Sequence, residues 1–197
     1  MTDATTPTDG SPGTTDASWL AIVDGATCAG CGLHAAAVPP AEVGDRLTAA
    51  AEAFAALLTD LDDEALRRRP DPATWSALEY AVHVRDAVEV FTGRIGRMLT
   101  EVDPDLGWWD HEAAIAAGAA DGATAAEVAD GLRAAVAGLV GSLPRLDADG
   151  RAGADGWSRR GVRRGTEVFT VASTARFALH EVVHHAADAA ASAAARA

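Results

Sequence analysis

The chain contains no lysine: all 16 of its basic residues are arginine, against 29 aspartates and glutamates. The formal net charge is therefore −13. A chain this acidic repels phosphate backbones, so we expect no nucleic-acid partner. The lysine-free, alanine- and arginine-rich composition is typical of a GC-rich genome and suggests an actinobacterial source.

Long hydrophobic runs are also missing. No run reaches the roughly 18 residues of a transmembrane helix, so we expect no membrane partner. Residues 1–17 lack the basic start and apolar stretch of a secretory signal, and their Thr, Asp, Gly and Pro content predicts a disordered tail. The expected location is the cytoplasm. The only two cysteines, Cys28 and Cys31, are expected there as thiols or metal ligands rather than as a structural disulfide.

Four stretches have the apolar periodicity of amphipathic helices. The first opens at Pro39 and Pro40 and runs to about Leu61. The second and third begin with capping boxes, Ser76 with Glu79 and Thr124 with Glu127, and the third should end before Pro144. The fourth follows Thr170. The predicted fold is all-α, a four-helix bundle over residues 39–192, preceded by a segment over residues 18–38 that carries the cysteines.

The connections between these helices are long enough to cross between non-adjacent helices, so an up-down-up-down order is not required. A short extended pair is expected between Trp157 and Thr170. No repeat or second domain is visible.

The most informative motif is His-Glu-Val-Val-His-His at residues 180–185. His180 and His184 are four residues apart, which places both imidazoles on one face of a helix. His83 lies on the apolar stripe of the second helix. We predict that His83, His180 and His184 form a metal triad, with ordinary core or surface histidines as the alternative. His185, about 100° round the helix, is expected to point away from the metal.

Residues 180–184 also match the zinc-protease motif H-E-x-x-H. One extended form of that motif needs Gly and His at positions 187 and 190, where this chain has Ala187 and Ala190. The other common form needs a downstream Glu, but none follows Glu181. A peptidase is therefore not expected.

The motifs Trp75-Ser-Ala-Leu-Glu-Tyr-Ala-Val-His83 and His180-x-x-x-His184 resemble those of the DinB superfamily over roughly residues 40–190. The resemblance implies a metal-binding four-helix bundle with ligands at positions matching His83, His180 and His184. It also implies chemistry similar to thiol S-transferases that use mycothiol or bacillithiol, and a possible homodimer.

A triad of imidazoles leaves coordination positions open, as in catalytic sites, and imidazole suits Zn, Ni or Fe. The leading expectation is a metal-dependent, mycothiol-dependent S-transferase that acts on a small molecule. The alternatives are a non-enzymatic metal-binding bundle with a stress or sequestering role, and a metal-dependent hydrolase.

Five further residues are candidates to support the metal or line a pocket: Glu79, Asp86, Trp108, Trp109 and Glu181. Each has a simpler alternative. Glu79 suits a capping box, Asp86 an ion pair with Arg85, the tryptophans a loop anchored on the core, and Glu181 a solvent-facing position. Arg159, Arg160, Arg163 and Arg164 form a basic patch, interpreted as a solvated loop or as a site for a substrate carboxylate.

Cys28-Ala-Gly-Cys31-Gly-Leu-His34 has the spacing of a zinc knuckle or a redox dithiol. A complete structural zinc site needs four ligands, whereas only Cys28, Cys31 and His34 are visible in the segment. A second metal site, a redox site and loose thiols therefore remain open alternatives.

Overall fold

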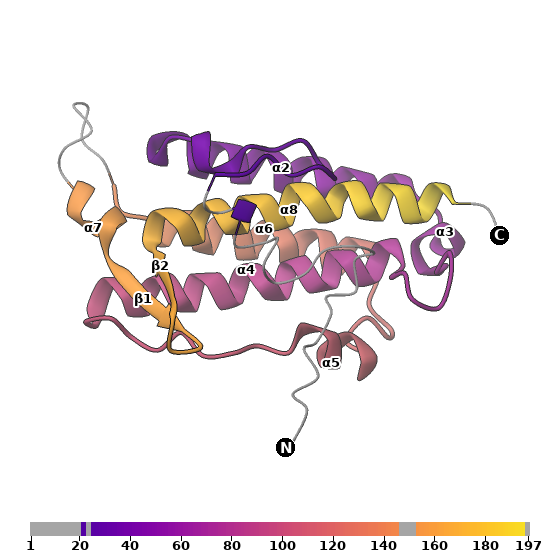
Figure 1. The fold of residues 1–197 in the computed structure, drawn as a ribbon. Helices are drawn as coiled ribbons and strands as arrows, with labels where there is room; N and C mark the ends of the chain where they lie inside the picture. The colour runs from indigo at the N-terminus through magenta and orange to yellow at the C-terminus, as the bar shows by residue number, and fades with distance from the viewer. Residues whose placement is uncertain (1–20, 23–24, 146–152, 196–197) are drawn as a thin grey trace, which may run out of the picture.

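The computed structural model describes residues 21–22, 25–145 and 153–195, so the predicted tail at 1–17 lies outside the described residues. Four long helices make up the bundle (Figure 1): α2 (Pro40–Asp60), α4 (Ala77–Thr100), α6 (Ala125–Ser142) and α8 (Val171–Ala194). All four agree with the stretches predicted from periodicity. No helix in the described part of the chain is long and apolar enough to cross a bilayer.

Shorter elements occupy the connections. They are the 3-10 turn η1 (Ala35–Ala37), α3 (Asp63–Arg67), α5 (His111–Ala116), α7 (Ala154–Ser158), and the antiparallel strands β1 (Arg160–Arg163) and β2 (Glu167–Thr170). The two strands confirm the expected extended pair. Pro104 and Leu106 hydrogen bond to Val162 and fasten the segment after α4 to β1.

The helices are not packed in chain order. α4 packs against α6 and α8, α2 packs against the same two helices, and α2 barely touches α4. Consecutive helices α2 and α4 therefore lie diagonally across the bundle, which requires the long crossovers. Phe91 meets Phe177 at a ring-centroid distance of 5.2 Å and Trp75 accepts a hydrogen bond from Ser192, so α4 and α8 run antiparallel.

Side-chain caps mark where α4, α6 and α8 begin. The Ser76 hydroxyl accepts from the Glu79 N–H at 3.3 Å, and the Glu79 carboxylate accepts from the Ser76 N–H at 2.8 Å. Thr124 and Glu127 repeat this box at α6. At the same end of the bundle, Arg68 donates to the carbonyls of Ala193 and Ala195 and so caps the C-terminus of α8.

Removal of the buried Ser76 cap tests this description. Ser76→Ala should lower the free energy of unfolding by about 1 kcal/mol, because the Glu79 N–H in the first turn of α4 loses its partner, the Ser76 hydroxyl. The measurement is chemical denaturation followed by circular dichroism. Thr48→Ala, at an exposed position within α2, is the control and should change stability by less than about 0.5 kcal/mol. Equal effects of the two substitutions would contradict the assignment.

Candidate metal centre

The middle of α8 carries four buried ionisable residues in six positions: His180, Glu181, His184 and His185. Because each residue advances about 100° around a helix, positions 180 and 184 form one stripe and positions 181 and 185 form the next. The bundle packs these two stripes against different neighbours. Two groups of metal-ligating side chains result.

The first group lies between α4 and α8. The Glu181 carboxylate oxygen Oε2 is 3.2 Å from His83 Nε2 and 3.4 Å from His185 Nε2. All three side chains are buried, and their ligand atoms lie within 4.8 Å of one another. His83 comes from α4, so the group exists only when the two helices pack in this register. We call it the His83–Glu181–His185 cluster.

Burial and ion pairing act against each other in this cluster. Burial lowers the pKa of His83 to about 4, although the hydrogen bond with Glu181 acts to raise it. Burial acts to raise the pKa of Glu181, but hydrogen bonds with His185 and His83 hold that pKa well below its usual range. Burial acts to lower the pKa of His185, but hydrogen bonds to Asp188 and Glu181 raise it to about 9. The metal-free cluster is thus a carboxylate beside one neutral and one protonated imidazole.

Aromatic rings fix the imidazole planes. Trp109 stacks on His83 with ring centroids 5.6 Å apart and planes 5° apart. His111, the first residue of α5, has its ring centroid 5.2 Å from that of His83. On the other side, Tyr80 stacks on His185 at 5.4 Å. The segment that follows α4 therefore covers one side of the cluster with a tryptophan and a further histidine.

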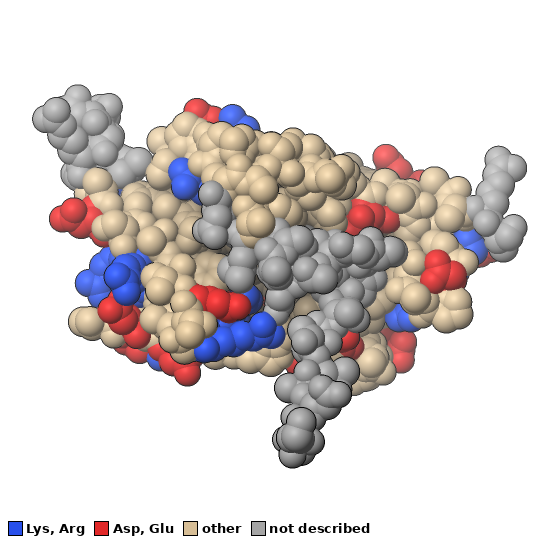
Figure 2. All heavy atoms as spheres, in the orientation of Figure 1, with Lys and Arg blue, Asp and Glu red and all other residues tan. Residues whose placement is uncertain are grey.

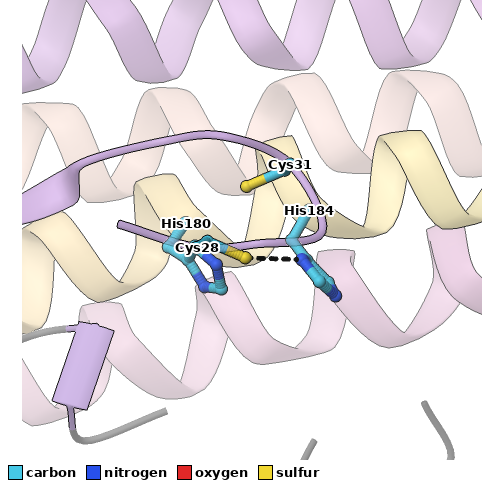
Figure 3. A group of neighbouring side chains, drawn as sticks. All are labelled: Cys28, Cys31, His180 and His184. Carbon is cyan, nitrogen blue, oxygen red and sulfur yellow. Dashed lines mark hydrogen bonds between the residues drawn. The ribbon is translucent and has the colours of Figure 1, made fainter. Parts of the chain in front are cut away.

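The second group combines α8 with the N-terminal segment (Figure 3). His180 and His184 lie with Cys28 and Cys31, and the four ligand atoms are within 4.8 Å of one another. Cys28 Sγ is 3.3 Å from His184 Nδ1. His34, predicted with these cysteines, is exposed and precedes η1 instead. The two histidines of α8 bring the number of possible metal ligands to four, which the cysteine segment alone could not supply.

The structure thus distributes the predicted triad over two groups. His83 does not share a group with His180 and His184 among the described residues. The expectation that His185 points away from the metal site requires correction, because His185 is buried against Glu181 and His83. Glu181 likewise faces the bundle interior rather than solvent. The four-residue spacing that matters beside His83 is Glu181 to His185, one position later than predicted.

The remaining candidates have local partners. Glu79 pairs with Arg69 at 2.5 Å in addition to its capping role, and Asp86 pairs with Arg85 at 2.7 Å. Trp108 lies beneath the Arg164 guanidinium, 3.8 Å from carbon to ring centroid. The basic patch is largely paired: Arg159 donates to the Met98 carbonyl, and Arg163 pairs with Glu167. Figure 2 shows basic and acidic side chains mixed at the hairpin end of this face.

Asp188 was not among the predicted site residues. Its Oδ2 is 2.9 Å from His185 Nδ1 and 3.3 Å from His184 Nε2. One carboxylate oxygen therefore lies beside a histidine from each group. The signals available in the sequence were the spacings from Glu181 to His185 and from His184 to Asp188, each four residues. These spacings are overlooked when only histidine pairs are considered as possible metal ligands.

The fold and this centre define a helical bundle with a buried His/Glu group capable of binding metal. A family model for the DinB superfamily matches residues 46–189, so the chain belongs to the DinB superfamily. The structure is similar to that of YfiT from Bacillus subtilis, described as a probable metal-dependent hydrolase with an unusual four-helix bundle topology. The TM-score is 0.62 at 18% identity, covering 75% of this chain and 84% of YfiT. No curated protein matched.

The protonated His185 makes the stability of the metal-free protein depend on pH. Its pKa is about 9 when folded and about 6.5 when unfolded. Its stabilising contribution is therefore complete below about pH 6.5 and is lost as the pH rises through about 9. After removal of metal by a chelator, we expect the free energy of unfolding to fall by roughly 3 kcal/mol between pH 6.5 and 9.5. Urea denaturation across this range measures it.

His185→Gln is the matched variant for this measurement. It should flatten the fall in stability between pH 6.5 and 9.5, because glutamine does not titrate. An unchanged slope in the metal-free variant would show that His185 does not hold a proton in the folded protein.

Proposed function

We propose that this protein is a metal-dependent enzyme whose divalent ion is held by His83, Glu181 and His185. The observation that carries the proposal is the convergence of two imidazoles and one carboxylate, from two helices, at a buried point. Ligands 2.0–2.1 Å from a tetrahedral ion are about 3.4 Å apart. The separations of 3.2 and 3.4 Å within the cluster agree with that spacing.

The donor set supports a catalytic role over a sequestering one. Two histidines and one glutamate make three ligands, and catalytic zinc sites keep a position open in this way. Zn, Ni and Fe all suit imidazole and carboxylate ligands. A divalent ion at such a site polarises a substrate oxygen and lowers the pKa of a bound water or thiol.

Hydrolysis is the reaction that we favour. Two histidines with a glutamate form the ligand set of known zinc hydrolases, and YfiT is described as a probable metal-dependent hydrolase. The chain's own residues have separate roles in this proposal. Asp188 accepts from His185 Nδ1 and orients that imidazole, and Trp109 stacks on His83 and holds its plane. His111 is the general acid or base that transfers the proton of the attacking water. The substrate is a small molecule.

A thiol S-transferase is the second candidate, with mycothiol as co-substrate. Two observations favour it: membership of the DinB superfamily, and the absence of lysine, which is typical of actinobacterial proteins. In this version, the bound metal would supply a site for the thiol, and His111 would receive the thiol proton. The two candidates differ in their nucleophile and share the same ligands.

Metal content tests the ligand assignment. His83→Ala should lose the ion of this cluster, because two ligands from α8 alone bind much more weakly. His34→Gln, at an exposed position in the N-terminal segment, is the control and should keep the content of the wild type. Elemental analysis after dialysis gives the result, with circular dichroism to confirm folding. Wild-type content in His83→Ala would overturn the assignment.

Activity tests the role of His111. His111→Gln should keep its metal but lose about 10²–10⁴-fold in kcat, the usual contribution of a general acid or base. Chromogenic esters and amides assay the hydrolase. Consumption of mycothiol with a generic electrophile assays the transferase. A metal-loaded wild type inactive in both assays would favour the non-enzymatic bundle, and an unchanged kcat in His111→Gln would exclude it as the proton-transfer residue.

A further inference from the structure

The two cysteines lie in a tight loop pressed against α8 (Figure 3). The Gly32 N–H donates to the Cys28 carbonyl at 2.8 Å, and the Cys28 N–H donates to the Leu33 carbonyl at 3.0 Å. Gly32 has a φ of +73°, a left-handed conformation that glycine adopts without strain. The loop therefore turns immediately after Cys31 and presents both sulfurs to the same side.

That side faces the stripe of α8 formed by His180 and His184. Two sulfurs and two imidazoles, all within 4.8 Å of one another, form a Cys₂His₂ set. Cys28 is buried and Cys31 half-buried, while both histidines are buried. Thiolate and imidazole ligands in a fourfold set are typical of structural zinc. The set draws two ligands from a C-x-x-C loop and two from one turn of a helix.

The orientation of His184 supports a metal at this point. Its Nδ1 faces Cys28 Sγ at 3.3 Å, while its Nε2 faces the Asp188 carboxylate at 3.3 Å. Histidines that bind metal through one ring nitrogen usually donate the other N–H to a carboxylate or carbonyl. His184 has a carboxylate beside its Nε2, and its Nδ1 on the cysteine side is the nitrogen that would bind the ion.

The loop also fits closely over that imidazole. A Cβ added at Gly30 would lie 2.7 Å from His184 Cε1, so only glycine lets the backbone approach the ring this closely. The segment is anchored beyond the loop as well, because Arg176 of α8 donates to the Val38 carbonyl at 2.8 Å and Ala35 is fully buried. These contacts hold the cysteines in place over α8.

We propose that Cys28, Cys31, His180 and His184 bind a structural zinc ion that fastens the N-terminal segment to α8. Four protein ligands complete a tetrahedral shell and leave no position for a substrate. Binding converts two thiols to thiolates, and both protons pass to solvent. The site uses ligands different from those of the His83–Glu181–His185 cluster, and the two groups adjoin at Asp188 and at the contact between the His184 and His185 rings.

Metal stoichiometry and cobalt spectroscopy test this second site. Reduced protein is stripped with a chelator and reloaded with Zn²⁺ or Co²⁺. We expect two ions per wild-type chain and one in Cys28→Ser/Cys31→Ser. Co²⁺ should show a thiolate charge-transfer band in the wild type and in His83→Ala, but not in the double variant. His34→Gln, from the same segment, should behave as the wild type.

The milder variant Cys31→Ser keeps the experiment informative if the double variant does not fold. It should weaken Zn²⁺ binding at this site at least tenfold, and it should leave Cys28 reactive toward a thiol reagent in zinc-loaded protein. In zinc-loaded wild type both thiols should be protected.

Three results would overturn the proposal: two ions in a folded double variant, no thiolate band in cobalt-loaded wild type, or a Cys28–Cys31 disulfide in zinc-loaded protein. Each is independent of the catalytic proposal. Failure of the catalytic site would appear as an unchanged metal content in His83→Ala, with the thiolate band still present.

Discussion

The arrangement of α4 and α8 depends on one buried carboxylate. Removing Glu181 from water is costly unless its charge is compensated by hydrogen-bonded partners. His185 supplies one partner from the next turn of the same helix, and His83 supplies the other from α4. A slip of α8 along α4 would leave the charge with only its local partner. The polar cluster therefore specifies the register of this helix pair, while the surrounding leucines, valines and aromatics supply most of the burial energy.

The adjacency of residues 180 and 181 gives α8 two distinct functional stripes. Neighbouring residues on a helix differ by about 100° in direction. One stripe consequently reaches α4 and the other reaches the N-terminal segment. Asp188 lies one turn farther along; its carboxylate accepts from His185 and lies 3.3 Å from His184 Nε2. A single carboxylate thus lies next to both proposed metal sites.

The long connections between the main helices explain how loop residues reach the site. The connections α2–α4 and α6–α8 join non-adjacent helices, and the connection from α4 to its neighbour α6 is also long enough to carry structure of its own. The connection after α4 first pairs with β1 and then brings Trp109 and His111 back along α4 to His83. The hairpin pairs Arg160–Arg163 with Glu167–Thr170 and leads directly into the Thr170 cap of α8. The chain thereby covers the cluster with residues that are distant from it in sequence.

Local patterns determined the four helices and their starting points. Apolar residues at helical spacing and the boxes at Ser76 and Thr124 act within a few residues, so they can be recognised without knowledge of the rest of the chain. The family also followed from residues in the sequence, and the same residues predicted a metal site that includes His83 and the 180–185 motif. Only the tertiary structure decided which four-residue pair faces His83. Positions 180/184 and 181/185 have the same spacing, and a rotation of about 100° about the axis of α8 exchanges them. That rotation is set by packing against α4 and the N-terminal segment. The same packing brings His180 and His184 next to Cys28 and Cys31, which are about 150 residues away in the sequence.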